Sequence, residues 1–126
     1  MRWTLHLVPV AVVAIAGCAS LASVKASVRD EMKAGVQAGQ HGYWQEALFR
    51  FERARTLKPD DPDILNDVAV SLEALGRYDE ALATYKQSLQ LNPRNTYVRR
   101  NYARFAEFYT SYARGVLPKG VFDAKH

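Results

Sequence analysis

Apolar side chains recur every three or four residues over long stretches of the chain, which is the pattern of helices that are buried on one face. The pattern is clearest within residues 62–95, where acidic and amide side chains hold several of the other positions. The two stripes consist of Leu65, Val68, Ala69 and Leu72, and of Ala81, Tyr85, Ser88 and Leu89. This pattern predicts an all-α protein in which each helix packs one stripe against its neighbours.

Glycine and proline divide the predicted helices at regular intervals. Gly42 and Gly76 stand where a helix ends and the chain turns, because glycine adopts the left-handed conformation without a side-chain penalty. Pro59 and Pro93 end the helices that begin after Gly42 and Gly76. Proline lacks an amide donor and pushes the preceding residue out of the helical region. The two glycines are 34 residues apart, and so are the two prolines. Each period of the chain therefore contains two helix ends.

Two stretches of the chain repeat each other at the same offset. They are GYWQEALFRFERARTLKPDD, from Gly42, and GRYDEALATYKQSLQLNPRN, from Gly76. The other matched positions are Trp44 and Tyr78, Glu46-Ala47-Leu48 and Glu80-Ala81-Leu82, Phe51 and Tyr85, and Leu57 and Leu91. This pattern resembles the tetratricopeptide repeat (TPR), in which each unit is a pair of antiparallel helices.

The resemblance implies a short TPR-type solenoid with two helix-turn-helix repeats, over residues 28–61 and 62–95. A solenoid needs a terminal helix to cover its last apolar face, and aromatic residues at helical spacing predict such a capping helix over residues 96–114. An irregular tail, residues 115–126, follows it. The aromatic residues of the predicted cap are Tyr102, Phe105, Tyr109 and Tyr112.

The first helix of the first repeat, expected over about residues 22–40, departs from the family pattern. Glu31, Ala34 and Ala38 stand where the family usually has larger apolar residues, and Gly35 is the one typical residue. We therefore expect this helix to pack less tightly than its counterpart in the second repeat.

An apolar segment with the length of a signal-peptide core precedes the repeats, from Leu5 to Ile15. It ends in the four residues IAGC, of which the last is Cys18, the single cysteine of the chain. These four residues resemble the bacterial lipobox, which has an aliphatic residue, two small residues and then a cysteine that is lipidated before cleavage on its N-terminal side.

The lipobox resemblance implies a cleaved signal peptide over residues 1–17, a lipidated Cys18 and a short tether over residues 18–27. Ala19 follows the cysteine, which by resemblance to enterobacterial sorting favours the outer membrane. Two other interpretations stay open. The uncharged stretch over residues 3–24 is long enough to span a bilayer without cleavage, and the cysteine could be a buried structural residue.

Length and charge narrow the class of protein. A chain of 126 residues has room for one small domain and a modest core. The net charge of +4, from 17 basic and 13 acidic residues, is too small for a protein whose main task is nucleic-acid binding. A single cysteine excludes an internal disulfide.

The sequence offers no credible catalytic or metal site. Without the leader, the histidines are His41, in a predicted turn, and His126, the last residue, so no catalytic triad can be assembled. Asp60, Asp61 and Asp63 form an acidic cluster without the glycine-containing loop of a calcium site, and Asp61 is expected to begin a helix. We expect neither an enzyme nor a bound cofactor or metal.

In the TPR family the first helix of each unit lines a concave groove that receives a peptide or a partner helix. Carried over by position, the resemblance implies a partner-binding groove made of Arg29, Met32 and Val36, then Asn66, Val70 and Glu73, and then Tyr97, Arg100 and Arg104. An apolar floor with two arginines at one end suits a segment that has apolar anchors and an acidic flank.

These observations together predict a membrane-anchored adaptor or scaffold lipoprotein on the periplasmic side of a bacterial envelope. Its partner is a protein or peptide rather than a nucleic acid, and the arginines near the C-terminus offer a further contact with anionic lipid headgroups. The alternative is a structural, self-associating subunit without a peptide groove, because two repeats bury little core and leave both ends of a solenoid open.

Overall fold

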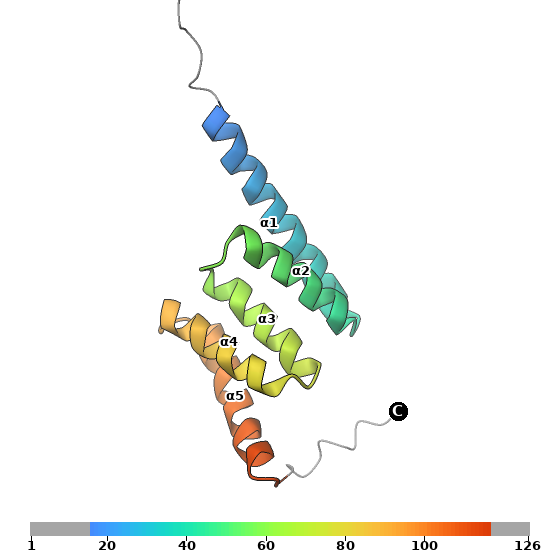
Figure 1. The fold of residues 1–126 in the computed structure, drawn as a ribbon, viewed down its shortest axis with the longest axis vertical. Coiled ribbons are helices and arrows are strands. Elements are labelled where there is room, and N and C mark those ends of the chain that lie inside the picture. The colour runs from blue at the N-terminus through green and yellow to red at the C-terminus, as the bar shows by residue number, and fades with distance from the viewer. Residues whose placement is uncertain (1–15, 117–126) are drawn as a thin grey trace, which may run out of the picture.

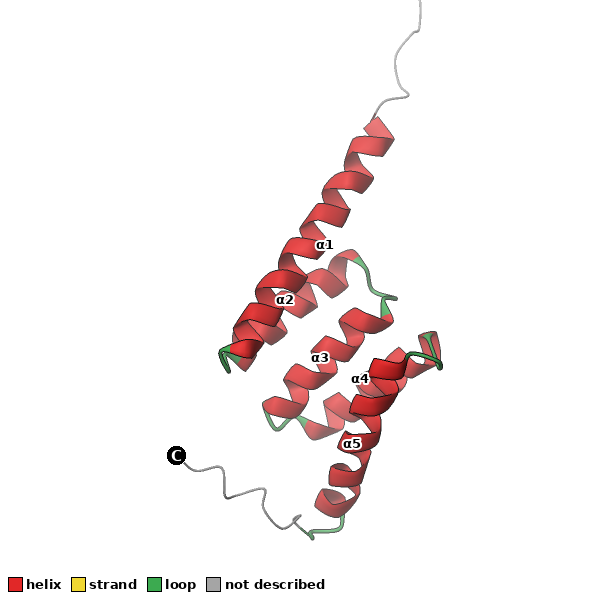
Figure 2. Ribbon diagram, turned by 180° about the vertical axis from the view of Figure 1, so that it is seen from behind, coloured by secondary structure: helices red, strands yellow, loops and turns green. Residues whose placement is uncertain are grey.

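The structure is a computed structural model that describes residues 16–116, and within that range it contains five α-helices and no strand (Figure 1). Short loops connect the helices, as the view from behind in Figure 2 also shows. The helices are α1 (Ala16–Gln40), α2 (Trp44–Leu57), α3 (Pro62–Ala74), α4 (Tyr78–Leu91) and α5 (Thr96–Ala113). The fold is therefore the all-α solenoid expected from the repeat, with α1 paired to α2 and α3 paired to α4.

The helices follow the period of the sequence. Helix α2 begins at Trp44 and α4 begins at Tyr78, 34 residues later, and their last residues, Leu57 and Leu91, have the same spacing. The matched glycines also share one conformation, since φ is 77° at Gly42 and 75° at Gly76. Both values lie in the left-handed region that favours glycine, so this sequence prediction is confirmed.

The starts of α3 and α5 are capped in the same way. Asp61 accepts hydrogen bonds from the backbone amides of Asp63 and Ile64, and Asn95 accepts them from the amides of Tyr97 and Val98. An N-cap side chain of this kind satisfies amides that have no partner inside the helix. The structure thus confirms that Asp61 begins a helix.

The apolar stripes predicted from the sequence form the core. Leu65, Val68 and Ala69 of α3 and Ala81, Tyr85 and Ser88 of α4 are fully buried. The hydroxyl of Ser88 donates a hydrogen bond to the carbonyl of Pro62 at 2.6 Å, so the polar member of the stripe ties α4 to the start of α3.

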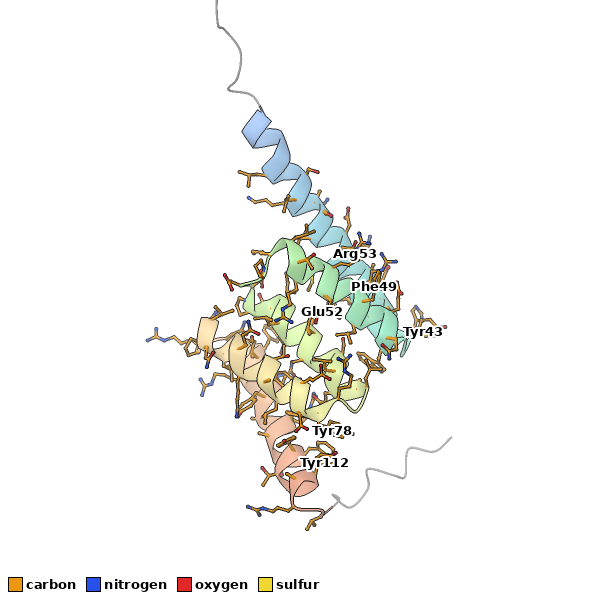
Figure 3. All side chains as sticks on the ribbon, viewed as in Figure 1. Tyr43, Phe49, Glu52, Arg53, Tyr78 and Tyr112 are labelled. Atoms are coloured by element: carbon orange, nitrogen blue, oxygen red, sulfur yellow. The ribbon has the colours of Figure 1, made fainter. Side chains whose placement is uncertain are left out.

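The aromatic residues of α5 pack onto α3 and α4. Phe105 is fully buried and its ring lies 5.5 Å from that of Tyr85. Near the other end of the contact, the rings of Tyr78 and Tyr112 meet edge to face at 4.8 Å. Figure 3 labels these two residues close to each other. Offset and edge-to-face ring pairs add stability beyond the area that they bury. These contacts attach α5 to the second repeat.

The outward side of α5 carries the residues of a cap. Leu65 and Ala69 of α3 are buried, whereas the residues 34 positions later, Arg99 and Ala103, are exposed. A helix that continued the solenoid would need an apolar surface at these positions. Helix α5 therefore keeps the inward stripe of a repeat and presents a small or charged outer stripe to solvent.

Helix α1 buries fewer of its described residues than α3 does, as the sequence predicts, yet it approaches α2 closely at one point. The reason is that small residues bring the helices together: a side-chain carbon at Gly35 would lie 2.5 Å from the ring of Phe51. Glu31 is buried, and its carboxylate pairs with Arg53 at 2.7 Å and with Arg50 at 3.3 Å. A buried carboxylate paired with two more exposed arginines and a close helix contact thus replace the larger apolar residues of the family pattern.

The first half of α1 extends beyond the two repeats (Figure 1). It begins at Ala16, earlier than the sequence indicates, so the residues expected to form a tether, 18–27, are helical. Leu21 and Val24 on this part are 67% and 38% exposed. None of the helices described within residues 16–116 combines the length and apolar character that crossing a bilayer requires.

Several sequence predictions fall outside the described residues. Most of the predicted signal peptide and most of the predicted tail lie there, at residues 1–15 and 117–126. The backbone of Cys18 belongs to α1, but its side chain is outside the described part of the structure.

Substitution of Gly35 by alanine is expected to destabilise the protein by about 1–3 kcal/mol, because the added methyl group would overlap the Phe51 ring. Thermal unfolding followed by circular dichroism measures the effect. The double variant Gly35→Ala/Phe51→Leu is the control, since the smaller side chain makes room for the methyl group and should recover part of the loss. A single variant as stable as the wild type would contradict the close packing of α1 on α2.

Candidate binding groove

Two adjoining hollows lie along the first helices of the repeats, and together they form what we call the groove. They share Trp44, at the start of α2, and Val70, in the middle of α3. Both shared side chains are half-buried, so each presents one apolar side to the core and another to the groove.

The first hollow lies between α1 and α3 and has a volume of about 310 Å³. Two glycines on α1 leave room there, since Gly35 and Gly39 bring only backbone to the wall. The full lining is Gly35, Val36, Gly39, Gln40, Trp44, Phe51, Asp67 and Val70. This wall is mostly apolar, and Asp67 is its one ionisable side chain.

The second hollow lies between α3 and α5 and has a volume of about 510 Å³. Its lining is Trp44, Val70, Glu73, Ala74, Tyr78, Arg104 and Phe108. The two charged members of this wall face each other, with Arg104 Nη2 at 3.5 Å from Glu73 Oε1. The other carboxylate oxygen of Glu73 accepts a hydrogen bond from the Tyr85 hydroxyl at 2.9 Å. The charges of this hollow therefore largely satisfy each other.

The carboxyl group of Asp67 is in a different situation. Its hydrogen-bond donor is the side-chain amide of Asn66, at 3.1 Å, and Asn66 in turn accepts a hydrogen bond from Asn101 at 3.0 Å. Burial raises the pKa of Asp67 to about 6, and the negative charges of Asp63 and Asp61 act in the same direction. Among the side chains of residues 21–116, no cation forms an ion pair with Asp67.

The structure brings four of the predicted groove residues to the two hollows. Val36 and Val70 line the first, and Val70, Glu73 and Arg104 line the second. Three others take different roles: Met32 packs against the core, Asn66 is buried as the partner of Asp67, and Arg29 is exposed on α1.

Arg100 and Tyr97 do not join the groove. Arg100 lines a separate hollow between the end of α4 and the start of α5, together with Leu89 and Tyr102. Tyr97 is 76% exposed. Arg100 and Arg104 therefore lie at different hollows and do not form the single basic end of the groove that the sequence predicts. Arg104 also has Glu73 as its counter-ion.

Sequence reasoning missed several residues that line the groove. Trp44 and Tyr78 occupy matched positions of the repeat, and both also line hollows. Asp67 could have been found from its spacing, because it lies three residues before Val70 and so shares its side of α3. Phe108 follows the same rule relative to Arg104, one turn earlier on α5.

The acidic cluster after α2 serves to begin a helix. Asp61 caps α3 and pairs with Lys58 at 2.6 Å. Among the side chains of residues 21–116, no group of three or more acidic, histidine or cysteine residues is arranged to hold a metal ion.

A comparison with known proteins supports the repeat. The tetratricopeptide repeat family model matches residues 40–99, from the last residue of α1 to the first turn of α5. No curated protein matches the chain. The match supports a TPR protein, and such repeats generally mediate protein–protein interactions and are typically non-catalytic scaffolds.

Replacement of Asp67 by asparagine is expected to stabilise the protein at pH 7 by roughly 1–3 kcal/mol. Because the pKa of Asp67 is about 6 rather than its ordinary 3.8, the folded protein holds this proton more tightly than the unfolded chain. Above about pH 6 the ionised carboxylate therefore has its full destabilising effect on the free energy of unfolding. This effect disappears as the pH falls toward 4, where the carboxyl group is protonated.

The measurement is the free energy of unfolding of the Asp67→Asn variant and the wild type between pH 4 and pH 7. Asp60→Asn is the control, because it removes a carboxylate that is exposed. A stability difference for Asp67→Asn that did not change over this pH range would contradict the burial of an unpaired carboxyl group.

Proposed function

We propose that this protein is a lipid-anchored adaptor of a bacterial envelope and that its groove binds a segment of a partner protein. The observation that carries the proposal is the groove itself, a mostly apolar surface around Trp44 and Val70 on the segment that matches the TPR family. Apolar grooves between helices are suited to extended or helical segments, whose side chains fill successive hollows.

The proposed anchor is Cys18. Support for it comes from the lipobox-like residues IAGC, and the backbone of Cys18 belongs to α1. Thirteen residues separate Cys18 from Glu31, which forms an ion pair with Arg53 of α2, and a helix rises about 1.5 Å per residue. This ion pair would therefore stand about 20 Å from the lipid.

A periplasmic position facing away from an outer membrane is part of this proposal, on the support of Ala19 alone. Two or more acyl chains on one cysteine would give stable anchoring, which a single chain does not. The protein would then hold its partner at the membrane without performing chemistry on it.

One observation favours a second function, that of a self-associating subunit. Leu21, Val24 and Val28 recur at helical spacing on the projecting part of α1, and the first two are exposed. Such a stripe would suit a second copy of the same helix. The contact surface would then be α1 instead of the groove.

Replacement of Cys18 by alanine is expected to abolish lipid labelling and to leave an uncleaved precursor, because the proposed lipidation precedes cleavage. The measurement is incorporation of an alkyne-tagged palmitate, followed by electrophoresis, in bacteria that express the full chain. Ser20→Ala is the matched control and should be labelled and processed normally. Equal labelling of the Cys18→Ala variant and the wild type would overturn the anchor.

A photo-crosslinking amino acid at Val36, which lines the first hollow and is 44% exposed, is expected to crosslink a partner protein in membranes. The matched control is Ala83, which is exposed on α4 and lines neither hollow of the groove. Equal crosslinking from both positions would contradict the groove. Crosslinks between two copies of this chain, formed from Val24 rather than Val36, would favour the self-associating subunit.

A further inference from the structure

We propose that the first hollow takes a lysine or arginine side chain of the partner segment, with the Asp67 carboxylate as its counter-ion. This inference rests on the proposed function, since it names the chemistry of the segment that the groove binds. It also reverses the partner charge expected from the sequence, where the arginines of α5 suggested an acidic flank.

The charge distribution around Asp67 favours a cation. The residues that face the hollow from α1 and α2 are uncharged, including Val36, Gln40 and Trp44. The charges nearest to Asp67 on its own helix and cap are those of Asp63 and Asp61, which are also negative. A positive group that enters the hollow would therefore be attracted by Asp67 and would meet no cation in the lining of that hollow.

The half-buried Asp67 differs from Glu73 and Glu31 in its partner. A carboxylate that leaves water without a cationic partner destabilises the fold. Glu73 has Arg104, and Glu31 has Arg50 and Arg53, whereas Asp67 has a neutral amide. The hollow thus holds one negative charge whose compensation would have to come from a ligand.

The shape and lining of the hollow suit a long basic side chain better than a small ion. A volume of about 310 Å³ exceeds the needs of a single metal ion, which would also require more than one charged ligand. The methylene stem of lysine or arginine packs on apolar surface while its charged end reaches a polar group. The rings of Trp44 and Phe51 offer such a surface, and an indole also attracts a cation placed over its face.

The second hollow extends the prediction to a neighbouring residue of the partner. Its wall contains Val70, Ala74, Tyr78 and Phe108, and its two charges are paired with each other. An apolar side chain is the group that fits there. The segment that binds is therefore expected to carry a basic residue near an aliphatic or aromatic one.

Selection from a random peptide-display library tests this inference without assuming a partner. The baits are the full chain, the Asp67→Asn variant and the Asp60→Asn variant, each immobilised in detergent. Peptides recovered on the wild type and on Asp60→Asn should be enriched in lysine and arginine next to apolar residues. The basic enrichment should disappear on Asp67→Asn, while the apolar enrichment remains.

A synthetic copy of one recovered peptide then gives the affinity. In a Trp3→Phe background Trp44 is the sole tryptophan, so its fluorescence reports occupancy of the groove. We expect Asp67→Asn to weaken binding about 10- to 100-fold, and exchange of the peptide's basic residue for norleucine to do the same. The two changes combined should cost little more than either alone, because both remove one contact.

Two results would overturn the inference. The first is a wild-type selection without basic enrichment, and the second is an enrichment that Asp67→Asn leaves unchanged. A different result would show that the proposed function fails. In a Val36→Trp variant the first hollow is filled, and recovered peptides that bound this variant and the wild type equally well would not be using the groove.

Discussion

The hydrogen bond from Tyr85 to Glu73 is the interaction on which the rest of the solenoid depends. The Tyr85 side chain is fully buried between α3, α4 and α5, with its ring 5.5 Å from Phe105 and 6.2 Å from Tyr102. Burial, reinforced by the adjacent carboxylate, raises the pKa of its hydroxyl, which therefore remains a donor. Since Glu73 also meets Arg104, one buried group fixes both the packing of the last helix and the charge at the edge of the groove.

The two ends of the solenoid are closed by different physical means. At the C-terminal end, aromatic rings such as Phe105 fill the space beside the second repeat, and the outer side of the same helix is polar. At the N-terminal end the helices approach closely at Gly35, and the buried Glu31 is neutralised by two arginines of α2. A buried carboxylate with two cations is tolerated, because each of its oxygens has a partner.

The sequence predicted the architecture well, since the fold follows from features that local chemistry controls. Glycines with positive φ, the Asp61 cap and the apolar stripes each have one strong physical consequence, and the structure confirms them. The groove was predicted in part. Val36 and Val70 line it as expected, whereas Arg100 lies elsewhere, because the residues of a helix turn through about 100° per position and the small angular offset decides which hollow a side chain enters. The lack of a cationic partner for Asp67 could not be predicted from the sequence, because it depends on the direction of every nearby basic side chain.

Helix α1 runs without interruption from Ala16 to Gln40 and carries the wall of the first hollow on its last turns. A continuous helix transmits rotation as well as distance, so the direction in which the groove faces is tied to the angular phase of the helix at its other end. Each residue inserted into the projecting part would turn the groove by about 100° and move it by about 1.5 Å, whereas an insertion of seven residues would nearly restore its direction. The length of this helical segment thus determines the direction in which the groove faces. A flexible linker of the same length would determine only how far the groove can lie from the other end of the linker.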